Sequence, residues 1–116
     1  MKYMMLIAGS EDEEARGPAA ERAAIYERIR VWFGEHSAAG RIIEGFELQP
    51  SSTATTVRVD GDGRATVTDG PFLEAKEMVA GYAILEVADL DEALALASSW
   101  PGSAALEIRP VVESGA

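Results

Sequence analysis

The chain has 116 residues, 47% of them hydrophobic, with 20 acidic and 10 basic residues and a formal net charge of −10. This size fits one globular domain over residues 1–116. The acidic balance argues against nucleic acid and against an anionic membrane surface, because both need clustered lysine and arginine; the lack of cysteine excludes disulfides, thiolate catalysis and cysteine-based metal sites.

The first two elements are predicted to be a strand and a long helix. Residues 2–8 are apolar on both alternating faces, so both faces of this strand should be covered. The same apolar run is too short for a signal peptide or a membrane span, and we expect a cytoplasmic protein. A helix is predicted over about residues 18–39, with Pro18 as its first residue and Gly40 as a left-handed stop. One stripe of this helix holds Ile25, Ile29, Trp32 and His36.

The rest of the chain predicts five strands and a second helix. Residues 41–48 form the next strand, and residues 55–59 and 64–68 form a hairpin joined by the turn sequence DGDG, with one face in solvent. A strand over 79–87 is followed by a helix that Asp89 caps, with Glu92 completing a capping box. The last strand lies in 105–112. The inner stripe of the second helix is predicted to be Leu90, Ala93, Leu94 and Ala97.

This order predicts an α+β fold of the ferredoxin-like type, a split β-α-β arrangement with an antiparallel sheet, two helices on one face and a β-hairpin insertion. Two helices cover only one face of the sheet, yet the first strand is apolar on both. A second copy packed sheet to sheet would cover the other face, so we predict a homodimer.

The segment VTDGPFLEAKE, residues 67–77, resembles the signature of the YCII-related family in its DGPF-motif branch. Supporting segments are AAGRIIEGFELQP, TVRVDGDGRATVTDGPF, VADLDEALALASSWP and LEIRPV, so the resemblance spans nearly the whole chain. It implies a single YCII-related/DGPF domain that forms a dimeric α/β barrel. Relatives in the wider superfamily are small dimeric enzymes acting on lactones or aromatic breakdown products. Some members resemble partners of alternative sigma factors.

One departure from the family pattern concerns a catalytic pair. In the branch where an enzyme is suspected, a histidine early in the first helix pairs with an aspartate. The early helix here, AAERAAIYERIR, has no histidine, and His36 is the only one in the chain. The resemblance therefore carries over Asp69 of the DGPF motif and not the pair.

Asp69 is the first candidate site residue, and two interpretations of its motif stay open. As structure, Asp69, Gly70 and Pro71 form a rigid corner and Phe72 fills the core. As a site, the corner aims the Asp69 carboxylate into a cleft, where burial would raise its pKa toward a value useful in catalysis.

The remaining candidates surround this motif or lie on the first helix. Glu77 and His36 are candidate acid–base partners of Asp69, with solvated loop charge and a half-buried helix-end histidine as the structural alternatives. Lys76 and Arg58 could orient an anionic group of a substrate, while Trp32 and Phe72 could form apolar contacts with it. No ligand set for a metal is recognised.

Two functions follow from these candidates. The first is a small cofactor-free enzyme that performs acid–base chemistry on a small carbonyl or lactone-type compound. The alternative is a non-catalytic dimeric module that binds a small molecule or a protein partner linked to sigma-factor regulation. The sequence does not choose between them.

Overall fold

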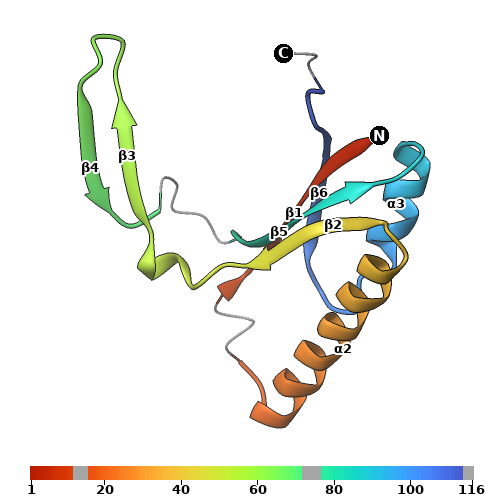
Figure 1. The fold of residues 1–116 in the computed structure, drawn as a ribbon. Coiled ribbons are helices and arrows are strands. Elements are labelled where there is room, and N and C mark those ends of the chain that lie inside the picture. The colour runs from red at the N-terminus through yellow and green to blue at the C-terminus, as the bar shows by residue number, and fades with distance from the viewer. Residues whose placement is uncertain (12–15, 72–76, 114–116) are drawn as a thin grey trace.

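The structure is a computed structural model that describes residues 1–11, 16–71 and 77–113. Its elements follow one another as two β-α-β units with a pair of strands between them (Figure 1). Their bounds are β1 Lys2–Gly9, α2 Ala19–Ala38, β2 Ile42–Glu47, the short 3₁₀ turn η1 Ser51–Thr53, β3 Thr55–Val59, β4 Ala65–Asp69, β5 Met78–Glu86, α3 Leu90–Ser98 and β6 Ala105–Pro110.

The main sheet has four strands in the order β2-β5-β1-β6, and all three neighbouring pairs are antiparallel. This order is compatible with the ferredoxin-like fold, so the predicted α+β class is confirmed. Strands β3 and β4 form a separate two-stranded antiparallel sheet, which Figure 1 shows standing away from the main sheet.

Alternation along the central strand β1 divides the sheet into two faces. Tyr3, Met5 and Ile7 are buried and belong to the same hydrophobic cluster as residues of both helices, so both helices lie on this face. Met4 and Leu6 point to the opposite face, which we call the open face, and are half-buried. Register extends the open face to Ile84 and Tyr82 on β5, which stand opposite Met4 and Leu6.

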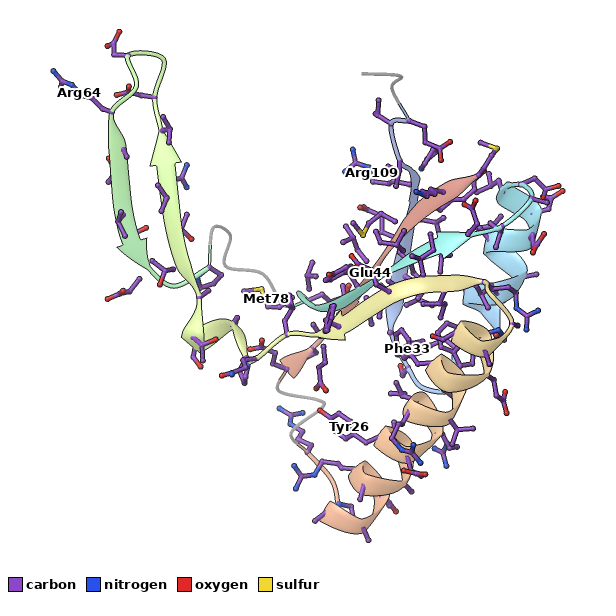
Figure 2. All side chains as sticks on the ribbon, in the orientation of Figure 1. Tyr26, Phe33, Glu44, Arg64, Met78 and Arg109 are labelled. Carbon is purple, nitrogen blue, oxygen red and sulfur yellow. The ribbon has the colours of Figure 1, made fainter. Side chains whose placement is uncertain are left out.

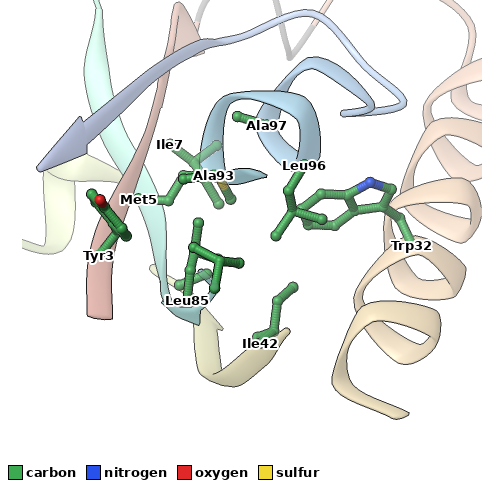
Figure 3. Packing of buried hydrophobic residues seen from close by; sticks show 11 residues of the cluster. Tyr3, Met5, Ile7, Trp32, Ile42, Leu85, Ala93, Leu96 and Ala97 are labelled. Carbon is green, nitrogen blue, oxygen red and sulfur yellow. The ribbon is translucent and has the colours of Figure 1, made fainter. Parts of the chain in front are cut away.

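The core lies between the helix-covered face of the sheet and the two helices (Figure 3). Met5 and Leu85 are fully buried at its centre, and Trp32 inserts from α2 between the sheet and α3. The Trp32 indole N–H donates to Ser99 Oγ at 2.8 Å. The one polar atom that the indole brings into the core is therefore paired, as buried tryptophan requires.

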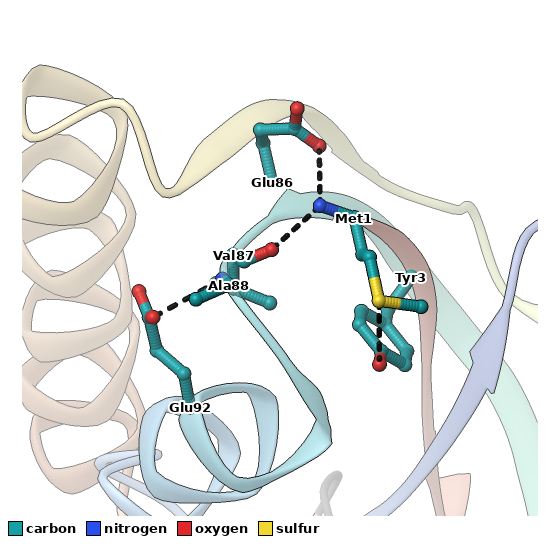
Figure 4. A network of polar contacts seen from close by, with 6 residues as sticks. All are labelled: Met1, Tyr3, Glu86, Val87, Ala88 and Glu92. Atoms are coloured by element: carbon teal, nitrogen blue, oxygen red, sulfur yellow. Dashed lines mark hydrogen bonds and ion pairs between the residues drawn. The ribbon is translucent and has the colours of Figure 1, made fainter.

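The ends of the helices follow the predicted signals. Gly40 has φ +77°, the left-handed conformation expected of a helix stop. At α3, Asp89 accepts a hydrogen bond from the Glu92 N–H, and Glu92 accepts one from the Ala88 N–H. Figure 4 shows the bond between Glu92 and the Ala88 N–H near the amino group of Met1, which donates to the Val87 carbonyl at 2.7 Å. The predicted capping box is confirmed.

Three sequence predictions need correction. Leu90 and Leu94 are 47% and 46% exposed, while Leu96 is buried with Ala93 and Ala97. Because α3 begins at Leu90, the face turned to the sheet starts one turn later than the pattern suggested. The second correction concerns element boundaries, since Pro18 is the N-cap of α2, one residue before the helix, and β2 is two residues shorter than predicted.

The third correction concerns the hairpin. The turn itself is as expected, since Asp60 accepts hydrogen bonds from the N–H groups of Asp62 and Arg64. However, the face that carries Val57, Val59 and Val67 is exposed like the threonine face, with exposed fractions of 56–67% for the three valines. The hairpin thus has two solvent-facing sides in the single chain, not one.

Neither α2 nor α3 is long and apolar enough to cross a bilayer, and the same holds for every helix within the described ranges.

The core prediction compares two leucines that differ in burial. Leu85→Ala should lower the free energy of unfolding by about 2–5 kcal/mol, because it leaves a cavity at the centre of the core. Leu94→Ala on α3, where the side chain is 46% exposed, should cost less than about 1 kcal/mol. Urea unfolding of both variants measures this difference, and equal losses would show that this core is not the source of stability.

Candidate functional site

A cleft opens on the helix-covered side of the sheet because the two helices differ in length. Helix α2 has 20 residues and α3 has 9. At about 1.5 Å per residue these lengths are about 30 Å and about 14 Å. The short helix fills the helix layer only beside the C-terminal half of α2. Beside the N-terminal half, the layer is left unfilled over the ends of the strands.

This cleft contains a cavity of about 290 Å³. One face of α2 lines it, with Arg22, Tyr26, Ile29 and Phe33 at the three- and four-residue steps that align on a helix surface. Figure 2 shows Tyr26 and Phe33 pointing from α2 toward the sheet. The strands and the loop before β6 supply most of the remaining walls. These include Ile7, Gly81, Trp100 and Ala104. The floor is therefore largely apolar.

The mouth of the cavity is polar and continues into a second hollow that shares Arg22, Tyr26, Glu47 and Ala80 with it. The Tyr26 hydroxyl donates to Glu47 Oε1 at 2.9 Å, which joins α2 to the end of β2. Glu11 accepts hydrogen bonds from the N–H and the hydroxyl of Ser51, both at 2.7 Å. These two bonds hold the pKa of Glu11 below its ordinary value, so its carboxylate stays charged near neutral pH.

An aromatic cluster closes the inner end of the cavity. The ring centroid of Trp100 lies 5.2 Å from that of Trp32 and 6.0 Å from that of Phe33, and both pairs are edge to face. Trp100 and Phe33 line the cavity, whereas Trp32 packs behind them in the core. A ligand in the cavity would therefore meet rigid aromatic surfaces on this side.

His36 and Trp32, two of the sequence candidates, lie together at the other end of α2. Their ring centroids are 4.7 Å apart, and His36 Nδ1 accepts a hydrogen bond from Arg41 Nε at 3.0 Å. Burial first, and then the Arg41 charge, hold the pKa of His36 below 6.5, although Glu35 opposes them. His36 is thus a neutral hydrogen-bond acceptor near neutral pH and does not line the cavity.

Asp69 and Arg58 lie on the hairpin, whereas His36 lies near the C-terminal end of α2. The six-residue strand β2 and the turn η1 lie between these two parts of the chain (Figure 1). Asp69 is exposed at the end of β4, opposite Thr55. Gly70, which follows it, has φ +99° and donates its N–H to the Ala54 carbonyl, so this corner holds the two hairpin strands together. Within the chain, Asp69 and His36 are not brought together.

The remaining candidates are distributed as follows. Glu77 is exposed just before β5 and does not line the cavity. Phe72 and Lys76 lie outside the described residues.

Sequence reasoning overlooked the residues that line the cavity. Tyr26, Glu47 and Arg22 were not among the site residues that the sequence predicted. Their shared feature is spatial, since Tyr26 on α2 and Glu47 at the end of β2 are 21 residues apart in sequence. The spacing of Arg22, Tyr26, Ile29 and Phe33 was the available signal, because it defines a continuous helix face next to the stripe that contains Trp32, with Ile29 common to both.

Within residues 1–11, 16–71 and 77–113, no three histidine, aspartate or glutamate side chains converge as a metal-ligand set.

Comparison with known proteins assigns the chain to a family. The family model of the YCII-related domain matches residues 1–114. The chain therefore belongs to the YCII-related family. It is also similar to R00369, an uncharacterized protein of Rhizobium meliloti (strain 1021), with 29% identity over 115 residues that cover 96% of this chain and 92% of that protein.

The lowered pKa of His36 predicts a pH dependence of stability. A histidine whose pKa is lower in the folded state contributes stability that is complete above the unfolded value of 6.5 and is lost as the pH falls through the folded value. The free energy of unfolding should therefore decrease from about pH 7.5 to about pH 5.5. His36→Gln should flatten this slope, as measured by urea unfolding at each pH.

Carboxylates also begin to titrate toward the acid end, and the difference between the wild type and His36→Gln isolates the histidine. Arg41→Ala should reduce the slope partly, because it removes the charge that disfavours the protonated ring. Identical slopes for the wild type and His36→Gln would contradict the assignment.

Proposed function

We propose that this YCII-related protein binds a small organic molecule in the α2 cleft and performs cofactor-free acid–base chemistry on a carbonyl or lactone-type compound. The observation that carries this proposal is the Tyr26–Glu47 hydrogen bond at the mouth of an apolar cavity. Ligand sites in proteins usually combine an apolar cavity with a few converging polar groups. A cavity of about 290 Å³ suits a small ligand.

Glu47 is the proposed acid–base group. Its carboxylate lies at the end of β2, where a ligand in the cavity would meet it, and the Tyr26 hydroxyl restrains one of its oxygens. The carboxylate would take a proton from a carbon beside the ligand carbonyl, or from a water that attacks a lactone carbonyl, and return it later in the reaction. Tyr26 is a positioning residue in this scheme.

The sequence candidate Asp69 stays a competing proposal for the same chemical role. It is exposed on the hairpin and does not line the cavity. A second copy of the chain could bring Asp69 to a cleft, which keeps the interpretation open to direct test. The experiment below separates the two carboxylates.

The test measures exchange of carbon-bound hydrogen for deuterium in a panel of small ketones and keto acids, together with hydrolysis of a panel of lactones. For any compound that reacts, Glu47→Gln should reduce the rate by about 100-fold or more, the usual contribution of a general base. Tyr26→Phe should reduce it less, because the carboxylate remains. Asp69→Asn should leave it unchanged.

Glu35→Gln is the matched control, since Glu35 is exposed on α2 and lines neither the cavity nor the adjoining hollow. A rate that falls with Asp69→Asn and not with Glu47→Gln would overturn the assignment to the cleft. Binding without turnover across the panel would favour the alternative, a non-catalytic dimeric module linked to sigma-factor regulation.

We also propose that the protein is a homodimer packed through the open face, which would form the dimeric α/β barrel that the family resemblance implies. Support comes from the apolar centre of this face, formed by Met4, Leu6, Tyr82 and Ile84. Charges flank it in the same cross-strand rows, with Glu44 on edge strand β2 and Arg109 on edge strand β6. A two-fold axis parallel to the strands would bring each Glu44 over the partner's Arg109.

The dimer proposal predicts the effect of a charge in the middle of the open face. Ile84→Glu should shift the protein from dimer to monomer at micromolar concentration, because burying an unpaired carboxylate between two sheets is costly. Leu94→Glu places the same charge on the exposed surface of α3, in place of another apolar side chain, and should leave the dimer intact. Light scattering gives the mass of each, and a monomeric wild type would exclude the proposal.

A further inference from the structure

The cavity in the α2 cleft carries an unusual charge for this protein. Among the residues that the structure describes, the charged groups lining this cavity are Arg16, Arg22 and Glu47, two arginines against one glutamate, while Glu11 lines only the adjoining hollow. The whole chain has a net charge of −10. A local excess of positive charge in so acidic a protein marks the cavity as a place where an anion is favoured over a cation.

The two arginines are uncommitted. Among the described residues, the guanidinium group of neither Arg16 nor Arg22 takes part in a hydrogen bond or an ion pair, although the backbone N–H of Arg22 donates to the Pro18 carbonyl. Arg30, on the outer side of the same helix, is instead paired with Glu27. Arginine presents its N–H groups in a planar fork that matches a carboxylate, so the free guanidinium groups at the cavity provide donors of the right geometry.

The acidic groups at the mouth already have donors. Glu47 accepts from Tyr26, and Glu11 accepts twice from Ser51. Because these carboxylates accept their hydrogen bonds from Tyr26 and Ser51, they do not pair with the arginine side chains, whose N–H groups stay available to a ligand. The glutamates would also repel an anion that entered without engaging the arginines, which favours ligands whose negative charge is at one end.

The rest of the cavity favours an apolar body. Beyond the mouth, Ile29, Phe33 and Trp100 face the cavity, and Trp100 is held edge to face by its neighbours. A flat or branched hydrocarbon group would bury its surface there, while a highly hydroxylated ligand such as a sugar would lose hydrogen bonds to water that the floor does not replace.

From this juxtaposition we propose that the ligand of the cleft is a small monocarboxylate with an aromatic or branched apolar body, whose carboxylate binds Arg22 and Arg16. This inference rests on the proposed function, because it uses the same cavity, and it adds the chemical class of the ligand. The apolar body would lie against Phe33 and Trp100, and its reactive carbonyl or C–H group would lie toward Glu47.

The experiment compares matched acids and amides as probes. A panel of phenylacetate, 3-phenylpropionate and 4-methylpentanoate is measured beside the corresponding primary amides, which keep the shape and lose the charge. Binding is followed by ligand-observed NMR. We expect the acids to bind more tightly than their amides. We also expect this advantage to decrease between about 0.05 M and about 0.5 M salt, because the pairs at the mouth are screened.

Variants then assign the charge. Arg22→Gln should weaken binding of the acids by about fivefold, the upper range for a partly exposed ion pair, and should leave the amides unchanged. Arg16→Gln should have a similar but separate effect. Arg28→Gln is the matched control, since it removes the same charge from the same helix outside the cavity.

The outcomes distinguish this inference from the proposed function. Equal binding of acids and amides, or equal effects of Arg22→Gln and Arg28→Gln, would overturn the anion inference while leaving a ligand in the cleft. Ile25→Trp, which fills the cavity from its rim, should abolish binding of every probe. Binding that survives Ile25→Trp, or no binding by any probe, would overturn both the inference and the cleft as the site.

Discussion

The fold and its cleft both depend on how Trp32 fixes one half of α2. The indole is buried between the sheet and α3, its N–H is bonded to Ser99, and its ring contacts Phe33, His36 and Trp100. Large aromatic side chains contribute strongly to core stability because of the area they bury. The C-terminal half of α2 is therefore held to the end of α3 and to the sheet, and the N-terminal half extends beyond the point of attachment.

The cleft is a consequence of that attachment. A helix of 20 residues anchored near its C-terminus must overhang a partner of only 9 residues. The overhanging half keeps an apolar lining in Ile25 and Ile29, but no part of α3 lies beside it to cover these residues. Ile25 is accordingly 38% exposed, although its sequence position belongs to the inner stripe of the helix. The Tyr26–Glu47 hydrogen bond then closes one end of the space against β2.

Much of the fold could be predicted from sequence because its signals are local. Gly40 ends α2, Asp89 and Glu92 cap α3, and a run that is apolar on both faces indicates that β1 is covered on both sides. The inner face of α3 was partly wrong, since alanines and leucines occur all around that helix and periodicity cannot orient such a short element. The hairpin was predicted as an element, but its distance from the main sheet is a tertiary property without a local signal.

The candidate site was much less predictable, for a physical reason. The DGPF motif attracts attention because a glycine and a proline constrain it, and the Gly70 corner does hold the hairpin strands together. A ligand site requires instead that side chains converge from separate elements, and Tyr26, Glu47 and Trp100 have nothing in common in sequence. The spacing of Arg22, Tyr26, Ile29 and Phe33 along α2 was a signal for one wall of the cavity, but it carries no information about the strands that complete it.

Strand β2 connects the two surfaces of the sheet that the proposals use. Glu47 stands opposite Gly81 and reaches the cleft, whereas Glu44 stands opposite Ile84 on the open face. Both side chains therefore depend on one register, which the irregularity between Ile42 and Glu44 sets. Because a shift of one residue would exchange the two faces, a contact that fixes β2 from the open side also fixes the position of Glu47. A second copy on the open face would thus stabilise the geometry of the cleft without touching it, and self-association would then have an indirect role in a site built from one chain.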